Sequence, residues 1–170
     1  SVGRELGLSK REAAAAYKKA RNLYETERRE QAEQELALYQ RDGMKILVCA
    51  HSYVYDDDYI GKPVIDFLRK NQVTVIRADY TDHDAAMQVS HKVSPNCRWE
   101  TNRELLGSIS MHSEEVDGII LMTAFPCCPD SVVNEIVKLK FPQKPILNLI
   151  LDGQSGVAGL ETRLESFIDI

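Results

Sequence analysis

Two adjacent cysteines lie where an expected strand ends and an expected helix begins. Cys127 and Cys128 follow the apolar run 118–122 and precede an amphipathic segment that starts near Asp130. Backbone N–H groups and the positive end of a helix dipole favour anions, and a thiolate is an anion. The position therefore suits a metal or cluster ligand, and we expect the Cys127 thiol to have a lowered pKa. The alternative is a proline-bracketed loop in which the two cysteines only pack.

Residues that could join the same site follow the other expected strands. His51 follows the first strand, Asp79 and His83 follow the second, and Gln154 follows the last. Parallel strands bring their carboxyl ends to one edge of a sheet, which is where ligands bind. His51 could equally cap a helix. The three aspartates 56–58 are better explained as partners of a helix N-terminus than as a Mg²⁺ or Ca²⁺ site, because the alternating spacing of a calcium loop is absent.

The pattern after Met44 predicts the elements that position these residues. Short apolar runs alternate with amphipathic segments, as expected for buried strands joined by helices. The expected strands are 45–50, 73–76, 118–122 and 145–151, and the expected helices are 57–70, 83–91, 101–112, 130–140 and 160–168. We predict an α/β domain with a Rossmann-like (flavodoxin-like) three-layer architecture: a parallel sheet in the order 2-1-3-4 with helices on both faces.

The first forty residues differ from the rest of the chain. Ser9 and Glu12 have the spacing of a capping box, and the segment 25–35 is almost wholly charged or amide-bearing. We therefore predict a long, largely solvated helix within residues 1–42, acting as a connector to an α/β domain at 43–170. The alternatives are a helix free in solvent or one that pairs with a second copy in a homodimer. The missing initiator Met and an end within an expected helix suggest a fragment of a larger chain.

Composition excludes several classes of function. A net charge of −5 at pH 7 argues against nucleic-acid binding, because no basic patch could neutralise a run of phosphates. No apolar run approaches a membrane span, and no secretory signal is visible. The four cysteines do not form a disulfide framework. We expect a reduced, cytoplasmic protein.

The usual catalytic and nucleotide-binding motifs are also missing. The sequence has no P-loop, no dinucleotide-binding glycine pattern, no nucleophile elbow and no C-x-x-C pair. The Gly-rich segment 152–156 could hold a phosphate through backbone N–H groups, but a tight connecting turn is the favoured interpretation.

Several segments resemble one known family. These segments are 50–53, 61–63, 124–131, 144–147, 154–156 and 159–167, the last being the most specific. They are similar to the acyl-CoA dehydratase activase-related family, whose members accompany 2-hydroxyacyl-CoA dehydratases such as the (R)-2-hydroxyglutaryl-CoA enzyme in anaerobic metabolism. In the dehydratase subunits a similar loop cysteine ligates a [4Fe–4S] cluster. The resemblance, which runs from about Met44 to the C-terminus, implies that Cys127 is a cluster ligand, although Cys128 stands where a small residue is usual.

The resemblance implies two alternative functions. The first is an iron–sulfur or redox-linked module of an activator or dehydratase-like component serving 2-hydroxyacyl-CoA dehydration. The second is a metal-free Rossmann-like docking or acyl-CoA-binding domain. The implied partners are the dehydratase and an ATPase-type activase region elsewhere in the parent chain. No nucleotide motif is present, so we expect no ATP hydrolysis by this chain alone, and the sequence leaves open whether it is an enzyme.

The expected site residues follow from both lines of reasoning. The candidates for metal binding are Cys127, Cys128 and Cys97, and the candidates for cofactor binding are Cys127, Cys128, His51, Gln154 and Arg163. A [4Fe–4S] cluster takes three or four thiolates. Cys49 falls in an expected strand, so further ligands would lie in the rest of the full-length protein.

Arg163 belongs to the last expected helix. Leu164 and Phe167 lie on an apolar stripe that should pack on the sheet, whereas Arg163 lies off the stripe. We expect Arg163 either to be held by a carboxylate, with Asp152 the nearest in sequence, or to face a phosphate of a ligand.

Overall fold

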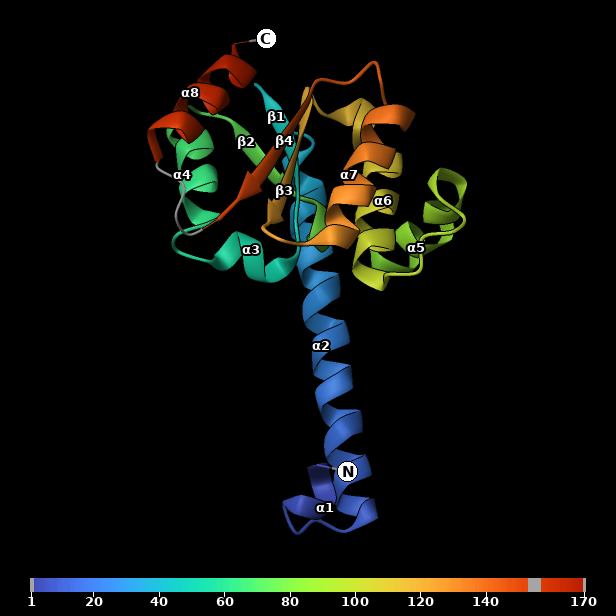
Figure 1. Ribbon diagram of the computed structural model, residues 1–170. Helices are drawn as coiled ribbons and strands as arrows, with labels where there is room; N and C mark the ends of the chain where they lie inside the picture. The colour runs from blue at the N-terminus through green and yellow to red at the C-terminus, as the bar shows by residue number, and fades with distance from the viewer. Residues whose placement is uncertain (1, 153–156, 170) are drawn as a thin grey trace.

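Four parallel strands form the centre of the computed structural model, which describes residues 2–152 and 157–169 (Figure 1). The strands are β1 (Lys45–Cys49), β2 (Thr74–Arg77), β3 (Gly118–Ala124) and β4 (Ile146–Leu151). Their order is β2-β1-β3-β4, and all three pairings are parallel. The two central strands, β1 and β3, are almost completely buried, because helices cover both faces of the sheet. The predicted α/β class and strand order are confirmed.

One face of the sheet is covered by α4 (Lys62–Lys70) and α8 (Val157–Ile168). Leu68 of α4 is fully buried in the same core cluster as Leu164 and Phe167 of α8. The apolar stripe predicted for the last helix is thus confirmed, and this stripe packs α8 against the sheet and α4.

The other face is covered by α6 (Glu100–His112) and α7 (Cys128–Lys140), and α5 (His83–Val93) packs on the outer side of α6. Two short 3₁₀ helices, η1 (Ala78–Tyr80) and η2 (Ser113–Glu115), complete the connections. Gly107 of α6 lies against the backbone of Ala86 in α5, where a Cβ atom would come within 2.1 Å of the Ala86 carbonyl oxygen. The two helices approach closely because residue 107 has no side chain.

A long helix projects from this domain (Figure 1). It is α2 (Lys10–Leu38), preceded by the single turn α1 (Val2–Glu5). Its capping box is confirmed: the Glu12 N–H donates to Ser9 Oγ at 3.3 Å, and the Ser9 N–H donates to Glu12 Oε2 at 2.9 Å. Among its residues only Ala32 and Glu35 are buried. The helix is therefore largely solvated, as predicted, and contacts the domain through its last turns.

The helix predicted for 57–70 begins only at Lys62, as α4, and a short helix that was not predicted, α3 (Ser52–Asp56), precedes it. Asp57 causes the break, because its carboxylate accepts hydrogen bonds from the N–H groups of Tyr59 and Ile60, both at 2.9 Å. Gly61 then allows a close approach to Val54, whose carbonyl oxygen would lie 1.9 Å from a Cβ at position 61. Asp57 thus stabilises a turn before α4, and the spacing of apolar residues does not predict this turn.

No helix in the described part of the chain combines the length and the apolar character needed to cross a lipid bilayer.

Candidate functional site

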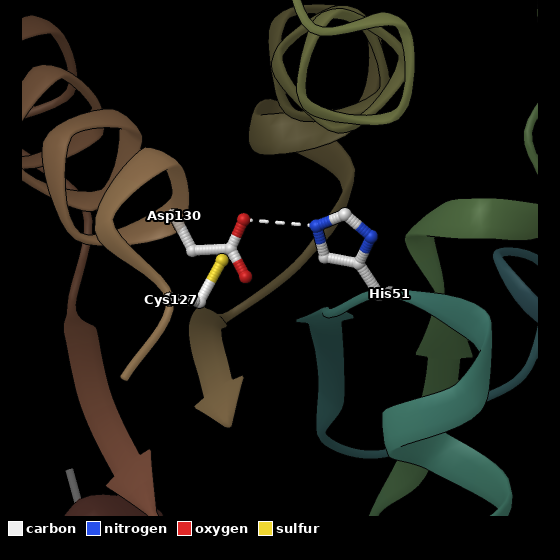
Figure 2. A group of neighbouring side chains, drawn as sticks. All are labelled: His51, Cys127 and Asp130. Carbon is white, nitrogen blue, oxygen red and sulfur yellow. Dashed lines mark hydrogen bonds and ion pairs between the residues drawn. The ribbon is translucent and has the colours of Figure 1, made fainter. Parts of the chain in front are cut away.

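Three side chains from distant parts of the sequence meet at the carboxyl edge of the sheet. They are His51, Cys127 and Asp130, and their ligating atoms all lie within 4.8 Å of one another. Figure 2 shows the imidazole facing the carboxylate, with the sulfur beside it. His51 Nε2 lies 2.9 Å from Asp130 Oδ1. We call this group the strand-tip centre.

His51 is positioned by the end of β1 and the start of α3. It occupies the N-cap of α3 and does not cap the helix with its side chain. Tyr55 fixes the strand end, because its hydroxyl accepts a hydrogen bond from the Ala50 N–H at 3.0 Å and donates to the Val48 carbonyl. The imidazole is therefore held over the sheet edge rather than used in the helix cap that the sequence also allowed.

Cys127 and Asp130 both belong to the first turn of α7. Cys127 is its N-cap and is partly exposed, while Asp130 is 4% exposed. The Cys127 carbonyl accepts hydrogen bonds from the N–H and the hydroxyl of Ser131, at 3.2 and 3.0 Å. Residues three apart at a helix start lie on the same side of the first turn, so the thiol and the carboxylate face one space.

Asn102 is a fourth member that sequence reasoning missed. It is buried on α6 and donates from Nδ2 to Asp130 Oδ1 at 2.8 Å. Asp130 Oδ1 thus receives two hydrogen bonds, whereas Oδ2 is buried and accepts none from the described residues. The sequence pattern indicated Asp130 only as the start of a helix. The Cys-x-x-Asp spacing could have indicated its role, but nothing local indicates Asn102.

The pKa directions follow from these contacts. Burial favours the neutral Asp130 carboxyl, but the donors His51 and Asn102, with the nearby Cys127 thiol, outweigh it and lower the pKa of Asp130. The hydrogen bond to Asp130 raises the pKa of His51. At neutral pH this pairing favours an ionised carboxylate.

The predicted lowering of the Cys127 pKa is wrong. Loss of solvent around the thiol, together with the negative charge of Asp130, raises the pKa of Cys127 above its usual value. The backbone N–H of Asp130 acts in the opposite direction, as expected for a helix start, but its effect is smaller. Partial burial of the thiol, reinforced by the carboxylate of Asp130, therefore outweighs the favourable effect of the helix start on the pKa of Cys127.

The other predicted thiol ligands lie apart from this centre. Cys128 begins α7 and is exposed. Cys97 lies between α5 and α6 and is buried in the core among Val93 and Leu105. Cys49 is buried in β1, as expected. Only Cys127 belongs to the centre in the described part of the chain.

Arg163 reaches the outer edge of the sheet. Its Nη2 donates to the carbonyl of Asn148 in β4 at 2.6 Å, and the side chain is otherwise exposed. This contact adds a backbone carbonyl to the expected partners of Arg163, and the expected pairing with a carboxylate or a ligand phosphate stays a prediction. Gln154 lies outside the described residues.

The end of β2 forms a separate charged cluster. Arg77 lies between the rings of Tyr55 and Tyr80, with its guanidinium carbon 4.1 and 4.2 Å from the two ring centres. It pairs with Asp79 at 2.9 Å and with Asp56 at 3.0 Å. The acids expected at the strand ends therefore neutralise an arginine instead of joining the strand-tip centre.

This cluster borders a groove of about 930 Å³ between α2 and the end of β2. Arg28 of α2 contacts Glu104 of α6 there, and His83 Nδ1 lies 3.3 Å from the same carboxylate. Because Arg28 and Arg77 are already paired with acids, the groove does not present them to an anionic ligand.

The strand-tip centre does not by itself fit a [4Fe–4S] cluster. Such a cluster takes three or four thiolates at one point, and the described residues bring one thiol to the centre. The buried carboxylate oxygen and the imidazole form a mixed donor set instead. A cluster at Cys127 would require cysteines from outside this chain.

Comparison with known proteins gives one finding. A family model described as the CoA enzyme activase uncharacterised domain (DUF2229) matches residues 1–81. The match runs through α2, β1 and β2 and includes His51, and it is consistent with the resemblance to an activase-related family. Neither the curated proteins nor the solved structures contain a significant match.

Proposed function

We propose that the chain is a module of an activase or dehydratase-like component that serves 2-hydroxyacyl-CoA dehydration. The support is that residues 1–81 match the family model of the CoA enzyme activase uncharacterised domain. Its functional centre in this proposal is the strand-tip centre. Its macromolecular partner is the dehydratase component.

One observation carries the assignment of the centre. His51 comes from the matched segment, whereas Cys127 and Asp130 come from the remainder of the chain. The carboxyl edge of an open parallel sheet is the usual ligand site of such folds. A partly exposed thiol, a partly exposed imidazole and a buried carboxylate at that edge form a centre that a partner or a small ligand can reach.

The redox link is a separate part of the proposal. The described residues supply one thiol at the centre, so an iron–sulfur cluster here depends on cysteines contributed by another segment or by the partner. The proposed role of the centre does not require such a cluster. Anaerobic iron and sulfide analysis of the full-length protein tests this part, and the absence of both elements would remove the iron–sulfur link.

The decisive experiment measures dehydratase activation by the full-length protein. We expect Cys127→Ser to reduce activation by about tenfold or more, because the variant lacks the thiol of the proposed centre. The thermal unfolding midpoint should not fall. His91→Ala is the matched control, because His91 is exposed on α5 and lies outside the centre. Full activation by Cys127→Ser would overturn the proposal and favour a docking or acyl-CoA-binding domain that does not use the thiol.

A further inference from the structure

The strand-tip centre carries a feature that its hydrogen bonds do not explain. Asp130 is 4% exposed, yet its Oδ2 is buried without a hydrogen-bond partner in the described part of the chain. Buried polar atoms are almost always satisfied, and a carboxylate oxygen left without a donor is costly. A missing ion is one of the ordinary explanations for such an atom.

The surrounding donors specify the kind of ion. A thiol and an imidazole lie with the carboxylate inside 4.8 Å. Imidazole and thiolate are ligands of Zn²⁺ and neighbouring transition metals, whereas Mg²⁺ and Ca²⁺ prefer oxygen atoms alone. We propose that His51, Cys127 and Asp130 bind a single divalent transition-metal ion of the Zn²⁺ class. This inference deepens the proposed function, because it names the ligand of the same centre.

The geometry is close to that of a tetrahedral site. Zn–N, Zn–O and Zn–S bonds of about 2.0–2.3 Å place neighbouring donor atoms roughly 3.3–3.8 Å apart. The three donors here are already within 4.8 Å, and His51 Nε2 is 2.9 Å from Asp130 Oδ1. Movements of about 1 Å or less, within the rotation of the partly exposed His51 and Cys127 side chains, produce the required spacing.

Asn102 prepares the carboxylate for this role. Its Nδ2 donates to Asp130 Oδ1 at 2.8 Å and so fixes the orientation of the carboxylate, whose Oδ2 has no hydrogen-bond partner among the described residues. Hydrogen bonds that orient a ligand in this way are a regular part of metal sites, and their removal typically weakens metal binding about 10-fold to 100-fold. Asn102 is therefore a positioning residue in the proposal.

Charge and exposure are consistent with the same ion. A Cys127 thiolate and an Asp130 carboxylate together neutralise a divalent cation, so the buried site carries no net charge. Three protein ligands leave a fourth position, and the partial exposure of His51 and Cys127 opens that position to solvent. Sites of this type hold a water molecule or an oxygen atom of a substrate in the open position.

The test uses full-length protein stripped of metal and titrated with Zn²⁺ alone, followed by calorimetry. Co²⁺ serves as a spectroscopic probe. We expect one ion per chain, a thiolate-to-cobalt absorption in the near ultraviolet, and one sulfur at about 2.3 Å from Zn²⁺ by X-ray absorption. Cys127→Ser and Asp130→Asn should each weaken binding at least about 10-fold, and Asn102→Ala about 10-fold.

Two matched controls separate the site from general metal affinity. Cys128→Ser removes the adjacent exposed thiol, and His91→Ala removes an exposed imidazole. Both should leave the Zn²⁺ affinity within about twofold, since neither residue belongs to the proposed site. Circular dichroism of each apo variant shows whether it folds, and Asp130→Asn keeps the shape of the carboxylate if Cys127→Ser is unstable.

The outcomes distinguish the metal site from the proposed function. No stoichiometric Zn²⁺ binding, equal loss of affinity in Cys128→Ser, or three or four sulfur ligands would each overturn the mononuclear site. If dehydratase activation still required Cys127 in that case, the proposed function would be retained without the metal site. Normal Zn²⁺ binding with activation indifferent to Cys127→Ser would support the site and overturn the proposed function.

Discussion

Glu35 on the long helix accepts a hydrogen bond from the backbone N–H of Arg77 at the end of β2. Glu35 is 9% exposed, and its carboxylate joins α2 to the outer strand β2 of the sheet. The adjacent turns of α2 contribute a second contact, in which Tyr39 stacks on His112 with ring centres 4.5 Å apart. The helix is therefore attached to the domain from about Arg28 onward, whereas its earlier turns project away from the domain (Figure 1).

This contact predicts a pH dependence of stability. Burial raises the pKa of Glu35 to about 7 from a usual 4.5, although the Arg77 N–H opposes the shift. Between these two pH values the folded chain retains a proton that the unfolded chain has lost. The free energy of unfolding should therefore fall as pH rises from about 4.5 to about 7, by a few kcal/mol at most.

The Glu35→Gln variant tests this dependence. Gln keeps an acceptor for the Arg77 N–H and cannot ionise, so the fall between pH 4.5 and 7 should flatten in urea unfolding curves. Glu33→Gln is the control, because Glu33 is exposed on the same helix. Identical pH profiles for wild type and Glu35→Gln would show that the carboxyl ionises normally in the folded chain.

A second prediction concerns the close approach of α5 and α6. Gly107→Ala should lower the free energy of unfolding by about 3 kcal/mol or more, because a methyl group would overlap the Ala86 backbone. Gly159→Ala is the matched control, since a Cβ there meets nothing within 4 Å. Alanine in that exposed helical position should be neutral or stabilise by up to about 1 kcal/mol. Equal melting temperatures for the two variants would refute the packing argument.

A third prediction follows from the burial of the cysteines. Iodoacetamide at pH 7 should modify Cys128 first, because it is exposed at the start of α7. Cys127 should react more slowly, since it is less exposed and its pKa is raised. Cys49 and Cys97 should react only on unfolding. Peptide mass mapping over time gives the order, and early modification of Cys97 would contradict its place in the core.

A fourth prediction concerns Arg163. Arg163→Ala should lower the free energy of unfolding by about 1 kcal/mol or less, because the lost partner is a carbonyl at an edge that water can reach. Hydrogen exchange of the β3 and β4 amides should rise locally. Glu161→Ala, an exposed change on the same helix, is the control. A loss of several kcal/mol would mean that Arg163 has a buried partner.

The sheet could be predicted from the sequence because burial on both faces leaves a strong signal. Continuous apolar runs marked the four strands, and the helical spacing of Leu164 and Phe167 marked α8. Glu35 was not predicted as buried, since it ends an almost wholly charged segment. Its burial is set by a backbone N–H that is 42 residues away in sequence.

The strand-tip centre was predicted only in part. Strand ends converge by topology, which brought His51 and Cys127 to one edge. Asn102 comes from a long connection whose path over the sheet depends on tertiary packing, so no spacing along the chain indicates it. The pKa of Cys127 was mispredicted because the helix start can be read from the sequence, whereas the burial of the thiol and its contact with the Asp130 carboxylate depend on the tertiary fold.

On each outer strand of the described sheet, one backbone group that faces away from the neighbouring strand forms a hydrogen bond with a side chain. The Arg77 N–H of β2 donates to a carboxylate from α2, and the Asn148 carbonyl of β4 accepts from the guanidinium of α8. An extended segment from another chain would have to displace these side chains before it could add to either edge. These two contacts therefore work against growth of the sheet by strand addition at either described edge.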